Sequence, residues 1–83
     1  MTQYYFTFYS LTQAQTALHQ IRRRGIDAQL KRTPSELAVR GCGYSVAVEE
    51  RAAHSAAAAL TAAAIAYRGL YREMGGSMQE VIL

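Results

Sequence analysis

The chain has a single cysteine, Cys42, whose immediate neighbours suit thiol chemistry. Gly41 and Gly43 flank it, and glycine has no side chain that could shield the sulfur from solvent. Arg40 lies one residue before Gly41, and a nearby cation favours a thiolate over a thiol. The alternative is a small apolar residue packed at the start of a strand, because unpaired cysteine is often buried. This stretch alone leaves both interpretations open.

Other residue types that carry chemistry give little support for a classical enzyme. His19 and His54 have no Cys, Asp or Glu at ligand spacing, so we expect no metal site, and nothing indicates a cofactor. One cysteine cannot form an internal disulfide, which favours a reducing compartment and a free thiol at Cys42. With no basic-then-apolar leader and no long apolar run, we expect a cytoplasmic protein with no membrane contact.

Length and composition predict one small globular domain. The 83 residues are 51% hydrophobic and 18% charged, and much of the apolar share is alanine. We expect a single domain over 1–74, followed over 75–83 by a flexible tail or an added edge strand. The net charge of +3 is mild, and it argues against a strong nucleic-acid binder.

The elements that must position Cys42 can be predicted from residue periodicity. Strands are expected at 4–9, 26–31, 44–49 and roughly 65–72, because these segments alternate or are rich in β-prone residues. Ser10 predicts a helix N-cap with Gln13 completing a capping box, and Gly25 predicts the end of that helix. The alanine-rich stretch 51–64 predicts a second helix, and Gly75-Gly76-Ser77 a flexible link.

Alternation within the aromatic run 4–9 separates two faces. We expect Tyr4, Phe6 and Phe8 to meet the core, and Tyr5 and Tyr9 to lie on an open or interfacial side. The element order is strand, helix, strand, strand, helix, strand. This order predicts an α+β fold of the ferredoxin-like βαββαβ type, with a four-stranded antiparallel sheet and both helices on one face.

Four short pieces occur in an order and spacing that is known from one protein family. They are Tyr5-Phe6-Thr7-Phe8-Tyr9-Ser10, Gly25-Ile26, Thr33-Pro34 and Cys42-Gly43. On these pieces the chain resembles the selenium/sulfur carrier-like family, a family of unassigned function. The similarity covers about residues 4–49, and a weaker similarity occurs at residues 67–71. The chain departs from the family at Ser35, where a basic residue is common, and at Val39-Arg40-Gly41, where a serine-rich approach is common.

The resemblance implies a carrier that acts through Cys42 and is not an enzyme in the classical sense. The thiolate would attack a donor persulfide, hold the outer sulfur and pass it to an acceptor. Arg40 and Arg32 would supply positive charge, and the Gly43 amide a hydrogen-bond donor. The implied partners are donor and acceptor proteins for sulfur or selenium. The absence of a second cysteine suits transfer between proteins better than redox catalysis.

Two other functions remain open as alternatives. Tyr5 and Tyr9 could stack nucleic-acid bases, but the third strand offers only Ser45 and Ala47 on the matching face. The chain could also be a non-catalytic interaction module that forms a homodimer through its open sheet face. Tyr5, Tyr9, Ala47 and the tail 78–83 would then form the contact.

Overall fold

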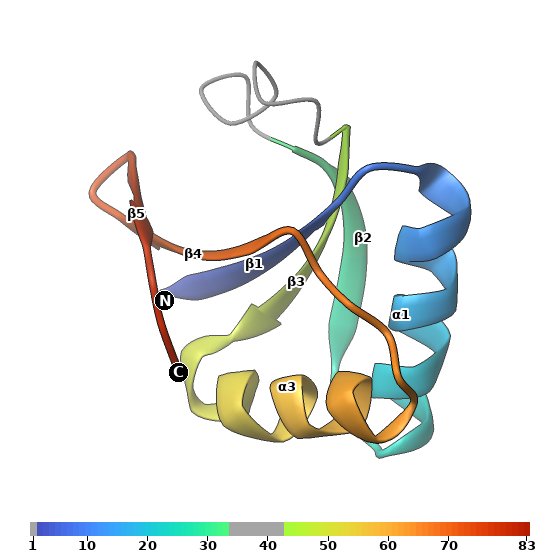
Figure 1. Cartoon of the computed structure of the whole chain (residues 1–83). Helices are drawn as coiled ribbons and strands as arrows, with labels where there is room; N and C mark the ends of the chain where they lie inside the picture. Colours follow the sequence, from blue (N-terminus) through green and yellow to red (C-terminus); the bar gives the residue numbers. More distant parts are fainter. Residues whose placement is uncertain (1, 34–42) are drawn as a thin grey trace.

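The computed structural model describes residues 2–33 and 43–83, and it shows an α+β architecture (Figure 1). The elements are β1 (Gln3–Phe8), α1 (Leu11–Arg23), β2 (Ala28–Arg32), β3 (Tyr44–Glu49), the 3₁₀ turn η1 (Glu50–Ala52), α3 (Ala53–Ala62), β4 (Gly69–Met74) and β5 (Ser77–Glu80).

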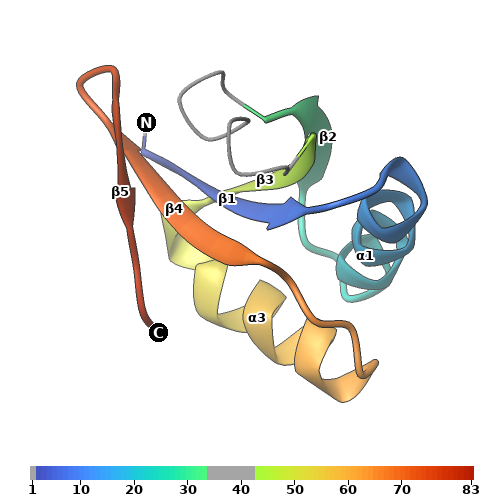
Figure 2. The same ribbon diagram turned by 45° about the horizontal axis from the view of Figure 1, so that its top comes forward.

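The strands form one antiparallel sheet in the order β2-β3-β1-β4-β5. The expected four strands are all present, but the count of four is wrong because β5 adds a fifth strand beside β4. Both helices lie on the same side of the sheet (Figure 2). The plan is therefore the expected strand–helix–strand–strand–helix–strand order with one extra edge strand at its end.

The core lies between the helices and one face of the sheet. Phe6 and Phe8 are fully buried there and Tyr4 is 7% exposed, so the expected orientation of the aromatic strand is confirmed. The small side chains of both helices allow the backbones to approach the sheet closely. The helices contribute Ala14, Ala17 and Ile21 from α1 and Ala53, Ala56, Ala59 and Leu60 from α3.

The ends of α1 follow the sequence signals. Ser10 is the N-cap, and its hydroxyl accepts a hydrogen bond from the Gln13 backbone N–H at 3.2 Å. Gly25 has φ +78, the left-handed conformation that glycine adopts readily after a helix. Arg22 has a specific role as well: its guanidinium donates two hydrogen bonds, of 3.0 and 2.8 Å, to the Ala28 carbonyl. These bonds tie the last turn of α1 to the start of β2.

The second helix is shorter than the expected span 51–64. It is preceded by η1 and ends with Ala64 in the left-handed region, at φ +57. The N–H groups of Ala64 and Ile65 donate to the carbonyls of Thr61 and Leu60, which is a Schellman motif. The helix stops there because these bonds turn the chain back toward the sheet.

The fourth strand starts later than the predicted 65–72. Ile65 and Tyr67 alternate because they pack on the core as the chain returns from the helix, before sheet pairing begins at Gly69. The Tyr67 ring meets Phe6 edge-to-face, with centroids 4.9 Å apart. The predicted flexible link is instead a tight hairpin turn, in which Gly75 and Gly76 have φ +56 and +84. Two successive positive φ values are typical of the type I′ turn, whose twist matches that of the flanking strands.

The sheet face opposite the helices is less accessible at its centre than expected. Tyr5 and Ala47 are only 6% and 4% exposed, whereas Tyr9 is 51% exposed. The expectation of an accessible side therefore holds for Tyr9 and is wrong for Tyr5.

Candidate functional site

Two of the five predicted site residues, Arg32 and Gly43, lie within the described residues. Cys42, Gly41 and Arg40 lie outside them. The two described residues are at the end of β2 and just before β3, so they mark where the chain leaves the sheet and where it returns (Figure 1).

A backbone hydrogen bond brings these two points together. The Thr33 N–H donates to the Gly43 carbonyl at 3.2 Å, one step beyond the register pair Arg32 and Tyr44. The β2–β3 pairing therefore continues to the residue that is covalently joined to Cys42. A Cβ built on Gly43 would have no neighbour within 4 Å, so its surroundings leave open space beside the backbone.

Arg32 places a positive charge at this end of the sheet. Its guanidinium carbon lies 5.6 Å from the centroid of the Tyr44 ring, in a cation–π arrangement. Within residues 2–33 and 43–83 the ion pair found joins Arg51 to Glu49, and Arg32 takes no part in it. The charge of Arg32 is thus held over Tyr44, two residues from Cys42 in the sequence, without neutralisation by a described carboxylate.

Thr33 is a feature that the sequence analysis did not single out. The residue is 7% exposed, and its hydroxyl oxygen is buried without a hydrogen-bond partner among the residues that the structure describes. An unmet buried hydroxyl costs about 1–3 kcal/mol, so proteins rarely retain one without a reason. The only sequence signal was its place directly before the single proline.

Arg68 and Tyr9 were also missed as a pair. The Arg68 guanidinium carbon lies 4.2 Å from the centroid of the exposed Tyr9 ring, and the Arg68 N–H donates to the Thr7 carbonyl at 2.8 Å. They belong to the same end of the sheet as Tyr44, because Phe8 pairs with Tyr44 in register. No pattern in the sequence indicated this pair, since Arg68 fell inside the strand predicted at 65–72.

Helix α1 also begins at this end of the sheet. It follows β1 directly, and its first turn carries no acidic residue. The N-terminus of a helix bears a partial positive charge that favours nearby anions. Arg32, Arg68 and the start of α1 therefore give this end of the sheet a positive potential, which can stabilise an anion such as a thiolate or persulfide.

The part of the chain that the structure describes contains no candidate metal site. No group of three or more His, Cys, Asp or Glu side chains gathers there in a geometry that could hold a metal ion. Nor does any helix among those residues combine the length and apolar character needed to cross a bilayer.

Comparison with known proteins gives one match. The model of a family described as "Putative Se/S carrier protein-like" matches residues 3–72. That range contains every residue of the candidate site, from Tyr9 through Arg32 and Cys42 to Arg68. No curated protein and no solved structure matches the chain.

Proposed function

Because the chain belongs to the Se/S carrier protein-like family, we propose that it carries one sulfur or selenium atom on the thiol of Cys42. The observation that carries the proposal is the family match over 3–72, which includes the single cysteine. The supporting geometry is the Thr33–Gly43 hydrogen bond, which ties the ends of the connection that contains Cys42 to the sheet. The family description supports a carrier role and not a catalytic one.

The transfer is a thiol exchange that needs no oxidant or reductant. The Cys42 thiolate attacks the outer sulfur of a donor persulfide, R–S–SH, so that the donor S–S bond breaks and a new one forms. The products are Cys42–S–SH and the donor thiolate, which keeps the electron pair of the broken bond. An acceptor thiolate then removes the outer sulfur by the same step in reverse. A donor of the form R–S–SeH would load selenium in the same way.

The positive end of the sheet supports the anionic states in this cycle. The thiolate, the ionised persulfide and the leaving thiolate all carry negative charge, and Arg32, Arg68 and the start of α1 all favour negative charge. The Gly43 amide and the Arg40 side chain are further donors in our proposal. Partner proteins that deliver or accept the atom would have to approach this end of the sheet.

The first prediction is that the protein accepts one sulfur atom at Cys42. The purified chain is incubated with a cysteine desulfurase and cysteine, and its intact mass is measured without reductant. We expect a gain of one sulfur that reductant removes and that the Cys42→Ser variant does not show. A selenium-loaded donor should give the corresponding gain of one selenium.

Alkylation rates test the electrostatic part of the same proposal. Arg32→Gln and Arg68→Gln should each slow the alkylation of Cys42 at neutral pH, because they reduce the thiolate fraction. Arg51→Gln removes the same charge at a distant ion pair and should leave the rate unchanged. An unloaded protein with a cysteine that alkylates slowly in every variant would contradict the carrier function and favour a structural cysteine.

A further inference from the structure

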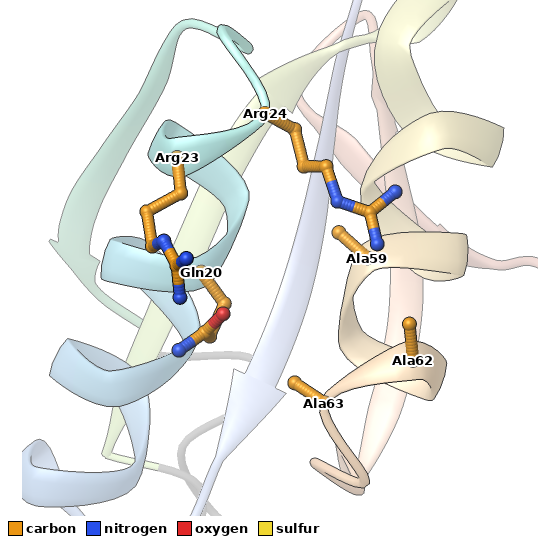
Figure 3. Close-up of a pocket in the computed structure, with 6 residues that line it drawn as sticks. All are labelled: Gln20, Arg23, Arg24, Ala59, Ala62 and Ala63. Atoms are coloured by element: carbon orange, nitrogen blue, oxygen red, sulfur yellow. The ribbon is translucent and has the colours of Figure 1, made fainter.

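An open groove lies between the C-terminal ends of α1 and α3, with a volume of about 210 Å³. In Figure 3 the Arg24 side chain extends from the end of α1 toward Ala59, and Arg23 and Gln20 lie together on the α1 side. The opposite wall consists of alanine methyl groups. The lining residues are Gln20, Arg23, Arg24, Ala59, Ala62 and Ala63.

The charged side chains that line this groove, Arg23 and Arg24, are both positive. Neither the segment 11–24 nor the segment 53–64 contains an Asp or a Glu, so no acidic side chain of either helix can pair with Arg23 or Arg24. The neighbouring Arg22 differs from these two, because its guanidinium is already bound to the Ala28 carbonyl. The groove therefore has two guanidinium groups that no carboxylate of its own walls can pair.

Several backbone carbonyls around the groove already accept hydrogen bonds. At the end of α1 the carbonyls of Ile21 and Arg22 accept hydrogen bonds from Arg24 and Gly25. At the end of α3 the carbonyls of Ala59, Leu60 and Thr61 accept from the residues of the Schellman motif. The charged donors that remain for a ligand are the guanidinium groups, which match the planar geometry of a carboxylate.

We propose that this groove binds a short acidic segment of a partner protein. Its carboxylates would pair with Arg23 and Arg24, and the methylene stem of a glutamate would lie against Ala59 and Ala62. The groove is small and open, which suits one or two side chains and not a whole helix. The alanine wall favours an acidic side chain over a free inorganic anion, because an anion gains nothing from methyl groups.

This surface is separate from the carrier end of the sheet. Helix α1 starts at that end and finishes at the groove, and its 13 residues correspond to a length of about 20 Å. A partner segment bound in the groove would therefore lie about 20 Å from the end of the sheet where Arg32 and Gly43 lie. The proposal does not depend on the chemistry of Cys42, and it can be tested in a Cys42→Ser background.

The test is a titration of the isotopically labelled protein with a capped peptide of alternating alanine and glutamate, followed by amide NMR spectra. We expect the largest shift changes at the residues that line the groove, and weaker binding as salt concentration rises. Arg23→Gln combined with Arg24→Gln should reduce the association constant about tenfold, which corresponds to about 1.4 kcal/mol. Both side chains are exposed, so the fold should persist.

Matched controls keep the result interpretable. Ala62→Glu places a carboxylate on the groove wall and should block the peptide. Ala58→Glu, at an exposed position of the same helix outside the lining, should not. The proposal is overturned if the glutamine version of the peptide binds equally well, or if the changes map elsewhere. It is also overturned if inorganic phosphate binds as tightly at the same residues, since the site would then be a general anion site.

Discussion

Tyr5 shows how a residue outside the proposed site can set a measurable property of the fold. Its hydroxyl donates a hydrogen bond to the Glu73 carboxylate at 3.3 Å, between β1 and β4. Burial raises the pKa of Tyr5 above its usual 10.0, and the negative charge of Glu73 and the hydrogen bond raise it further. The folded state therefore holds the phenol in its neutral form more strongly than the unfolded chain does.

Because of this difference, the free energy of unfolding changes with pH in the alkaline range. The stabilisation from neutral Tyr5 is complete below the unfolded pKa of about 10 and is lost as the pH rises through the higher folded pKa. Glu73→Gln removes the charge, so the pKa of Tyr5 should fall and the alkaline loss of stability should become less steep. Tyrosine ¹³C NMR across alkaline pH gives the pKa, and urea unfolding at each pH gives the stability.

A neighbouring carboxylate supplies the control for this prediction. Glu80 on β5 lies opposite Tyr71 on β4, and the hydrogen bond of the Tyr5 hydroxyl goes to Glu73 and not to Glu80. Glu80→Gln makes the same change in net charge and should leave the pKa of Tyr5 close to its wild-type value. An equal fall in both variants would mean that overall charge, and not the Glu73 contact, raises the pKa.

At the scale of residues, type and spacing single out candidate side chains but not their contacts. Cys42, its two glycines and Arg40 follow from residue type and spacing as candidates, and the family resemblance adds Arg32. Arg68 could not be chosen, because its place over Tyr9 depends on how the chain returns from α3 to the sheet. Thr33 could not be chosen either, since a threonine before a proline says nothing about whether its hydroxyl will be buried without a partner.

At the scale of elements, the end of α3 contains a strained residue that lowers the free energy of unfolding. Ala64 adopts φ +57, where an L residue with a Cβ pays about 1–2 kcal/mol relative to the right-handed region. Ala64→Gly should raise the free energy of unfolding by about 1 kcal/mol, because glycine adopts this conformation without that cost. Urea unfolding followed by circular dichroism measures the change.

The same substitution elsewhere in α3 should have the opposite sign. Ala58 is exposed in the middle of the helix, so Ala58→Gly should lower the free energy of unfolding by about 1 kcal/mol. The pair separates the backbone effect from any general effect of glycine. Destabilisation in both variants would show that residue 64 is not left-handed in solution.

The two helices differ in how well the sequence predicts their ends, and the reason is physical. α1 has a serine cap at its start and a glycine at its end, and each restricts the backbone in a known way. α3 has neither. Both of its cap positions are alanines, which favour the helical conformation but do not mark where a helix begins or ends. Its end is set by Ile65 and Tyr67, which must turn back to reach the core.

At the scale of the whole molecule, the order of elements was predictable and the number of strands was not. The four predicted strands and two helices follow from periodicity, and the family match also ends near β4, at residue 72. The fifth strand depends on the turn at Gly75-Gly76, and a sequence with two glycines is equally compatible with a flexible link. The structure shows a strand there, and the Val81 N–H just beyond β5 still donates to the Leu70 carbonyl of β4 at 2.8 Å.

This contact predicts that β5 unfolds together with the core. Val81 is half-buried against the core, whereas Ile82 is 94% exposed. Val81→Ser should therefore lower the free energy of unfolding by about 1 kcal/mol, through lost apolar burial, while Ile82→Ser should change it by less than about 0.5 kcal/mol. Hydrogen exchange should protect the Val81 amide nearly as well as those of β4. If both variants are neutral and the Val81 amide exchanges freely, β5 frays independently and the cooperative unit ends at β4.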